Sequence, residues 1–335
     1  SYVELVLTNG VSRRDNRTVG VETGDPRQFE SFEEVQEAFR KQLAWVTKQC
    51  QISGNINERS VLDLFPTTYE SALIEGCIEK GMSREEGGAH YNFNTGSYTT
   101  GATDAGDSLA AIKRLVFDDK TITMDQLCDA LEDDFEGHED ILQMCLDAPK
   151  FGNDDDYADE QVSWVHHVWV SECTKIKNSR GGSCSPGGSP MMLYASLGRA
   201  VGALPSGRLA GKPLADGHSP SPGNDRNGPT AVLNSVSKVD NVEITGGIIL
   251  NMRMDPSAFK DGNMARLANL VRAFVDQKIY HMQINIVSSD TLRAAQEEPD
   301  KHQDLMVKVA GYNAFFTHLN KTLQNSIIAR TEHGL

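Results

Sequence analysis

The most distinctive candidate for chemistry is a glycine close to the C-terminus. Gly311 follows the run Val307-Lys308-Val309-Ala310 and precedes Tyr312, so strand-forming residues lead directly into a glycine and then an aromatic ring. The simplest interpretation is a turn in which Gly311 supplies a positive φ. The alternative is that the position needs a residue without a side chain for a chemical reason, and the surrounding sequence favours this alternative.

The other motifs that could carry chemistry are weak. The glycine-rich stretches 87–91 and 96–106 lack the glycine–lysine pattern of a phosphate-binding loop, and no strand–loop–helix unit surrounds them. Turns are therefore the expected structure there. The acidic runs 118–119 and 154–156 lack the spacing of a calcium-binding loop, so solvated faces or helix N-caps are expected.

The cysteines indicate neither a metal site nor a disulfide framework. None of the six belongs to a C-x-x-C motif or to a cysteine–histidine cluster with the spacing of zinc ligands. No basic and apolar leader of a secretory signal is visible, so reduced thiols and a cytoplasmic location are expected. The six are Cys50, Cys77, Cys128, Cys145, Cys173 and Cys184.

The composition is that of an acidic globular protein. In 335 residues, 32 Lys and Arg against 47 Asp and Glu leave a net charge of −15, and 39% of the residues are hydrophobic. Nucleic acid binding needs clustered positive charge, so such a partner is not expected. No run approaches the roughly 18 continuous apolar residues of a membrane span. The sequence starts without Met inside an apolar, helix-like segment, and we therefore expect a longer protein.

Helical and strand-like patterns alternate along the second half, which predicts an α/β protein with a largely parallel sheet, open or closed. Thr123, with Gln126 three residues later, predicts a helix start. The stretches 181–188 and 205–229 are too rich in glycine and proline for either element, and loops as long as the second are usually functional or mobile. The expected helices are 32–46, one beginning at Thr123 that buries Phe135, 160–177, 262–276, 289–297 and 320–331, and the expected strands are 244–252, 281–287 and 305–310.

Beyond these patterns, the sequence resembles the glycyl radical enzymes, the superfamily of pyruvate formate-lyase, glycerol dehydratase and their relatives. Residues 305–316 and 324–331 are similar to the family's radical signature, and 281–287 to the strand upstream of it. The resemblance continues through residues 202–208, 213–217 and 228–232, and back to 87–92 and 150–154. It implies an α/β fold, half of a ten-stranded β/α barrel in residues 1–204, and the end of the barrel plus a C-terminal glycyl radical domain in 205–335, with the motif at 305–331.

The resemblance also implies the role of Gly311, which is radical storage. A Cα radical is shared between the flanking amide and carbonyl, so the carbon must flatten, and a side chain would obstruct this. In the family a separate radical-SAM activase, with S-adenosylmethionine and a 4Fe–4S cluster, removes one glycine hydrogen, so no permanently bound cofactor and no metal are expected. The radical is expected inside a core sealed from water and oxygen. Tyr312, Gln324 and Arg330 are expected to support the glycyl loop.

The family's radical passes to a cysteine in a Gly-Cys-x-Glu loop. Gly76-Cys77-Ile78-Glu79 imitates this pattern, but it lies far too close to Gly311 in sequence. Its cysteine also belongs to the stretch 69–77, which reads as one helix. Cys77 is therefore expected to be a structural cysteine. The resemblance implies that the reactive cysteine lies on an N-terminal part that is absent from this chain, so the expected partners are that part, the activase and a second copy in a homodimer.

The segment before Gly202 corresponds to part of the family's substrate pocket. Cys184, Met191, Met192 and Tyr194 are candidate pocket residues, although the methionines could equally pack the barrel wall. The expected reaction is lyase- or dehydratase-type cleavage of a C–O, C–N, C–S or C–C bond in a small organic substrate. A fumarate-adding succinate synthase and a formate acetyltransferase-like enzyme remain alternatives, as do a spare radical module and a scaffold without a radical.

Overall fold

The computed structural model describes residues 1–93, 97–189, 192–259 and 263–334. Its helices are α1 (Tyr2–Leu7), α2 (Phe32–Leu64), α3 (Thr68–Ser71), α4 (Cys77–Lys80), α5 (Ala102–Ile112), α6 (Met124–Glu132), α7 (Glu139–Asp147), α8 (Asp156–Thr174), α9 (Leu193–Gly198), α10 (Pro229–Ser237), α11 (Met264–Asp276), α12 (Ser289–Glu297) and α13 (Lys321–Ala329). Its strands are β1 (Leu250–Met254), β2 (Met282–Ile286), β3 (Met306–Lys308), β4 (Asn313–Phe315) and β5 (Glu332–His333).

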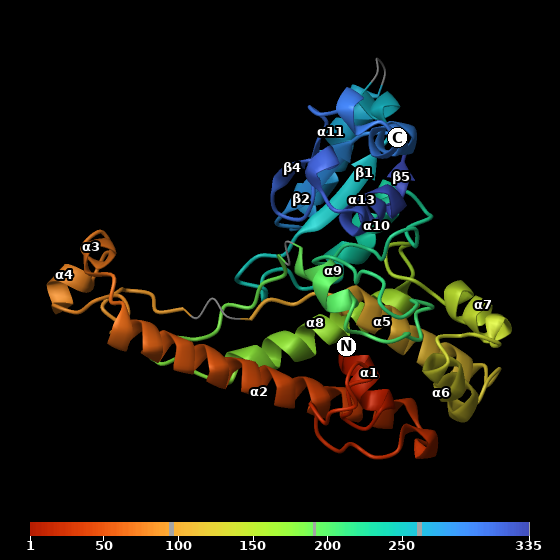
Figure 1. The fold of residues 1–335 in the computed structure, drawn as a ribbon, viewed down its shortest axis with the longest axis horizontal. Helices are drawn as coiled ribbons and strands as arrows, with labels where there is room; N and C mark the ends of the chain where they lie inside the picture. The colour runs from red at the N-terminus through yellow and green to blue at the C-terminus, as the bar shows by residue number, and fades with distance from the viewer. Residues whose placement is uncertain (94–96, 190–191, 260–262, 335) are drawn as a thin grey trace.

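The elements form two connected bodies. In Figure 1, the strands gather with α10, α11 and α13 at one end of the molecule, while α2 crosses the other end beneath α8 and carries α3 and α4 outward on an arm. The loop 205–229 has no helix or strand before its last residue, Pro229, where α10 begins, and it runs between the bodies, as expected from its composition. Within the described ranges, no helix is both long and apolar enough to cross a bilayer.

The predicted parallel sheet is present. β1 pairs in parallel with β2 from Leu250 opposite Met282 onward, and β5 pairs in parallel with the end of β1. Isolated parallel bridges continue the arrangement from Ile248 to Gly188 and from Gly187 to Tyr98. The predicted strand 244–252 is wrong at its start, because a turn at 245–246 and the positive φ of Gly247 delay β1 to Leu250.

The predicted strand 305–310 also needs correction. It is not a member of the parallel sheet but one arm of a hairpin, in which β3 pairs antiparallel with β4. Gly311, at φ +91°, reverses the chain, and the backbone amide of Val309 donates to the carbonyl of Tyr312 at 2.9 Å. The sequence pattern missed β4 and β5 because strands of two or three residues carry no readable alternation.

Most predicted helices are present within a few residues of their expected bounds. Thr123 caps α6 in a reciprocal capping box with Gln126, as expected. Ser31 forms a similar box with Glu34 at the start of α2. The main difference is the length of α2, which continues to Leu64 instead of ending near 46. From residue 46 on, no proline interrupts the chain before Pro66, and the helix passes through Gly54 although several of its later apolar side chains are exposed.

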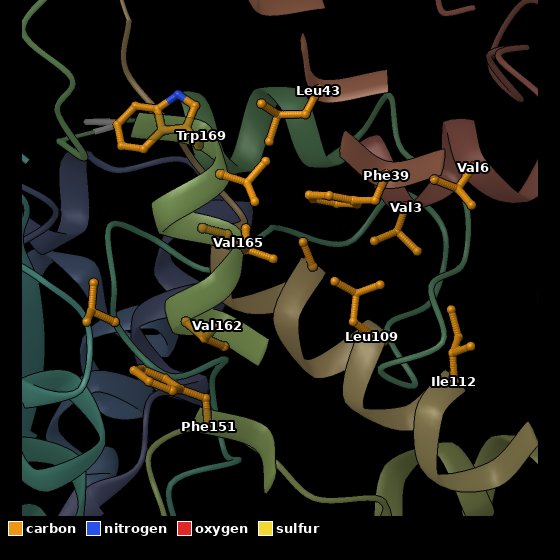
Figure 2. Packing of buried hydrophobic residues seen from close by; sticks show 14 of the residues in the cluster. Val3, Val6, Phe39, Leu43, Leu109, Ile112, Phe151, Val162, Val165 and Trp169 are labelled. Atoms are coloured by element: carbon orange, nitrogen blue, oxygen red, sulfur yellow. The ribbon is translucent and has the colours of Figure 1, made fainter. Parts of the chain in front are cut away.

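The principal core lies where α1, α2, α5 and α8 meet. Figure 2 shows side chains from all four helices converging, and their members include Val3, Val6, Phe39, Leu43, Leu109, Ile112, Val162, Val165 and Trp169. Phe39, Leu109 and Val162 are completely inaccessible to solvent. Leu250, Met252 and Met254 of β1 belong to the same cluster, so the helical body and one face of the sheet share one core.

Gly106 sets the separation of α5 and α8, and it provides a first test of the packing. A Cβ atom at Gly106 would lie 2.7 Å from Val162 Cα, closer than atoms can pack. In an isolated helix, Gly106→Ala would add about 1 kcal/mol of stability. Here we expect the crowding to dominate and to lower the free energy of unfolding by about 1–3 kcal/mol in urea titrations. An increase in stability would contradict this packing.

Candidate functional site

Gly311 lies at the tip of the β3–β4 hairpin, against the sheet. Its backbone N–H donates to Gln283 Oε1 on β2 at 3.3 Å. A Cβ atom built on Gly311 would lie 3.0 Å from Ser189 Oγ and 3.1 Å from Ile249 Cδ1. The positive φ and these two close neighbours both favour a residue without a side chain at this position.

The strand that leads to Gly311 is fixed by side chains from two other elements. Asn285 on β2 pairs with both backbone groups of Lys308: its Oδ1 accepts from the Lys308 N–H at 2.7 Å, and its Nδ2 donates to the Lys308 carbonyl at 2.8 Å. Arg330, just after α13, donates to the carbonyls of Lys308 and Val309 at 3.3 and 2.6 Å. The backbone before the glycine is therefore held from both sides.

Of the three predicted support residues, Arg330 is the one whose side chain hydrogen-bonds the strand before the glycine in the described structure. Gln324 is buried and donates to the carbonyl of Phe316 at 3.0 Å, which ties α13 to the end of the hairpin. Tyr312 packs against the apolar cluster under α12 and α13, and burial raises the pKa of its phenol. Its hydroxyl has no hydrogen-bond partner among the described residues.

The predicted pocket residues separate into different environments. Tyr194 is 1% exposed and belongs to the cluster that contains Ala310, the residue before Gly311. Cys184 lies in the principal core instead, where Gln51 Nε2 donates to its Sγ at 3.1 Å. Met192 is 48% exposed at the start of α9, and Met191 lies outside the described residues. The structure thus brings Tyr194, but not Cys184, into the same cluster as the strand before Gly311.

The sealed core expected around Gly311 is not completed by the described residues of this chain. The resemblance implies a sealed core, but Gly311 is exposed, although its neighbours Val309 and Ala310 are fully buried. On the sheet side the hairpin tip is hydrogen-bonded to Gln283 and lies close to Ser189 and Ile249, and the described residues leave its other side open.

Cys77 has the environment of a structural cysteine. It is buried at the start of α4, on the arm that Figure 1 shows far from the strands and from the C-terminus. The predicted continuous helix through residues 69–77 is wrong: α3 ends at Ser71, and Gly76 with φ +96° precedes α4. Across the described parts of the chain, no group of three or more His, Cys, Asp or Glu side chains is arranged to hold a metal ion.

The sequence interpretation missed Gln283, Asn285 and Asp216 as site residues. Gln283 and Asn285 alternate with apolar residues along β2, and both are buried. Two amides on one face of a strand indicate a polar neighbour on that side, and this signal could have marked Gln283 and Asn285 as candidate site residues. Asp216 gave no comparable signal, because its partner Arg330 is more than a hundred residues away in sequence.

Comparisons with known proteins agree with this geometry. A family described as "Pyruvate formate lyase-like" matches residues 1–198, and one described as "Glycine radical" matches residues 214–317. Trans-4-hydroxy-L-proline dehydratase of Clostridioides difficile is 41% identical over 98% of this chain and 42% of its own length. Isethionate sulfite-lyase of Bilophila wadsworthia is 37% identical over 99% of this chain and 41% of its own.

The solved structures agree as well. Glycerol-bound B12-independent glycerol dehydratase from Clostridium butyricum superposes with a TM-score of 0.96 and 40% identity, covering 100% of this chain and 42% of that one. The expected α/β fold with a parallel sheet and a glycyl radical domain is thereby confirmed. The chain spans about two fifths of the length of the curated relatives that it matches.

Proposed function

The chain belongs to the glycyl radical enzymes, and from this premise we propose that it is the part of a radical lyase or dehydratase that stores the unpaired electron on Gly311. The observation that carries the proposal is the position of Gly311, in the family's radical signature, at a turn with φ +91°. The similar dehydratases and sulfite-lyases favour bond cleavage in a small organic substrate.

Within the proposal, this chain's residues restrain the backbone around Gly311. Gln283 fixes the amide of the glycine, and Asn285 and Arg330 fix the two peptide groups before it. A planar Cα radical needs neighbouring peptide groups that stay in one orientation, so that the electron remains shared between them. Tyr312 and Gln324 act less directly, by anchoring the hairpin to α13.

The reactive cysteine and the cover over Gly311 are proposed to come from a part of the enzyme outside these 335 residues. The exposure of Gly311 and the coverage of about 42% of each relative support this. Cys77 does not fit the role, because it is buried on the distant arm. A radical-SAM activase and a second copy in a homodimer complete the proposed partners, and the division at residue 204 is the proposed domain boundary.

The test is electron paramagnetic resonance of the full-length protein after anaerobic treatment with a radical-SAM activase. We expect a doublet, because the unpaired electron couples to the single remaining α hydrogen. Protein grown with α-deuterated glycine should give a single line instead. Admission of oxygen should then cut the chain at Gly311, as mass spectrometry would detect. An intact chain after exposure to oxygen, or a doublet that is unchanged by α-deuteration of glycine, would refute the assignment.

A further inference from the structure

Two buried carboxylates of the loop 205–229 hold the last residues of the chain. Asp216 pairs with Arg330, with 2.7 Å between Oδ2 and Nη2, and these side chains are only 6% and 8% exposed. Asp225 pairs with His333, with 2.7 Å between Oδ2 and Nε2, and its other oxygen accepts from the hydroxyl of Thr331. Buried ion pairs of this kind are costly unless every polar atom around them is satisfied.

Only the first of these pairs reaches the radical strand, which is the stretch 306–310 that leads to Gly311. The guanidinium of Arg330 that contacts Asp216 also donates to the carbonyls of Lys308 and Val309, and the carbonyl of Val309 lies two residues before Gly311. The planar guanidinium directs its donors at fixed angles, so an acceptor on one side determines where the other donors point. The position of the Asp216 carboxylate therefore determines the position of these two peptide groups.

Asp216 is itself held in place. Its Oδ1 accepts from Ser219 Oγ at 2.5 Å and from Asn251 Nδ2 at 3.1 Å, and Asn251 belongs to β1. The carboxylate thus faces donors on both of its oxygens. The connection runs from the sheet through Asn251, Asp216 and Arg330 to the strand before the glycine, and each step is a direct hydrogen bond.

We propose that Asp216 is a positioning residue for the radical site. It acts through Arg330 as a latch, meaning that the Asp216–Arg330 pair must separate before Gly311 can leave its place against the sheet. The proposal rests on the proposed function only in taking Gly311 as the radical position. Asp225, by contrast, hydrogen-bonds Thr331 and His333, and among the described residues it has no hydrogen bond to the side chain of Arg330 or to residues 306–310. The two carboxylates therefore differ in a way that substitution can measure.

Asp216→Asn tests the latch with little change of shape. The amide has only one acceptor oxygen, so its NH₂ group must face either Arg330 Nη2 or the donors of Ser219 and Asn251. Loss of a charge-assisted hydrogen bond corresponds to about a tenfold or larger rise in local opening. Hydrogen–deuterium exchange of the full-length, radical-free protein should show that rise in peptides covering 305–313.

The matched controls are Asp290→Asn, which removes an exposed ion pair with Arg293 in the same body, and Asp225→Asn. We expect the first to leave exchange unchanged, and the second to raise it at 330–333 more than at 305–313. Peptides from α5, which is fully buried, report global unfolding and should not change in any variant. If Asp216→Asn leaves 305–313 unchanged, or accelerates exchange equally in α5, the latch is wrong.

A second variant covers the case in which Asp216→Asn fails to fold. Arg330→Lys keeps the positive charge beside Asp216 but lacks the fork that reaches both carbonyls, so it should raise exchange at 305–313 by a similar factor. Unchanged exchange there would also overturn the proposal. In activated protein, both variants should gain and lose the radical signal several-fold faster than the wild type. Absence of a signal in the wild type would refute the proposed function, whereas the exchange results would still decide the latch.

Discussion

Gly311→Ala is expected to abolish the radical signal and the oxygen-dependent cleavage completely, while the protein still folds. The new methyl group would lie 3.0 Å from Ser189 Oγ and 3.1 Å from Ile249 Cδ1, so the α carbon could not flatten without moving one of them. The backbone at φ +91° also strains any residue with a Cβ, at about 1–2 kcal/mol. Activation followed by electron paramagnetic resonance and mass spectrometry measures the first effect, and thermal unfolding the second.

A matched control separates radical chemistry from backbone strain. Gly181 has φ +80° and open space around the position of a Cβ atom, so Gly181→Ala carries similar strain without crowding. It should lose stability to a similar extent and keep the full radical signal. If Gly311→Ala retained a doublet, Gly311 would not be the site at which the radical is stored. If Gly181→Ala also lost the signal, backbone strain alone would account for the loss in Gly311→Ala.

The comparison of sequence and structure shows which features short patterns can predict. The capping box at Thr123 and the bounds of α12 follow from the side chains of adjacent residues, and both are present as expected. The β3–β4 hairpin was misread as part of the parallel sheet, because Val307 to Ala310 has the same alternation in either arrangement. The positive φ of Gly311 turns the chain back into a hairpin, and a backbone angle cannot be read from a sequence.

The residues of the candidate site also differ in whether the sequence alone predicts them. Gly311 was identifiable from its motif, whereas Gln283 and Asn285 acquire their roles only when β2 is placed beside the hairpin. Cys184 and Tyr194 are ten residues apart, but α9 begins between them, and they enter different clusters. The resemblance implies that both residues line a pocket, whereas in this structure they pack into different clusters.

Two buried histidines are each predicted to contribute a loss of folding stability as the pH falls into the mildly acidic range. His166 on α8 and His218 in the loop 205–229 are fully buried, and none of their ring nitrogens has a hydrogen-bond partner in the described structure. Burial lowers the pKa of His166 to about 4. Burial, together with the positive charges that His166 and His281 would carry, lowers the pKa of His218 to about 3.

The direction of the effect follows from these values. In the unfolded chain both rings take up protons below about pH 6.5, while in the folded protein they stay neutral until about pH 4 or lower. The unfolded state therefore binds more protons between these values, and the stabilisation present above pH 6.5 is lost as the pH falls. For each ring the loss between pH 7 and pH 4 amounts to about 3 kcal/mol.

Buried carboxylates change the folding stability in the opposite direction as the pH falls, so the contribution of a histidine has to be measured with variants. Burial raises the pKa of Asp107 to about 7 and also raises that of Asp104, so their protonation stabilises the folded state as the pH falls. The wild-type curve alone is therefore a sum of opposing effects. The contribution of one histidine is the difference between the wild-type curve and that of a variant lacking the ring.

His166→Leu, compared with the exposed neighbour variant His167→Leu, isolates that contribution. Leucine fills apolar surroundings without an ionisable group, so His166→Leu should flatten the fall in unfolding free energy between pH 6.5 and pH 4 by about 3 kcal/mol. His167→Leu, on the same helix and with a side chain that is 67% exposed, should keep the part of the fall that comes from the buried ring of His166. Urea titrations across this pH range measure both. Equal slopes for His166→Leu and the wild type would mean that His166 is already charged in the folded protein, and therefore that a group or solvent reaches its ring.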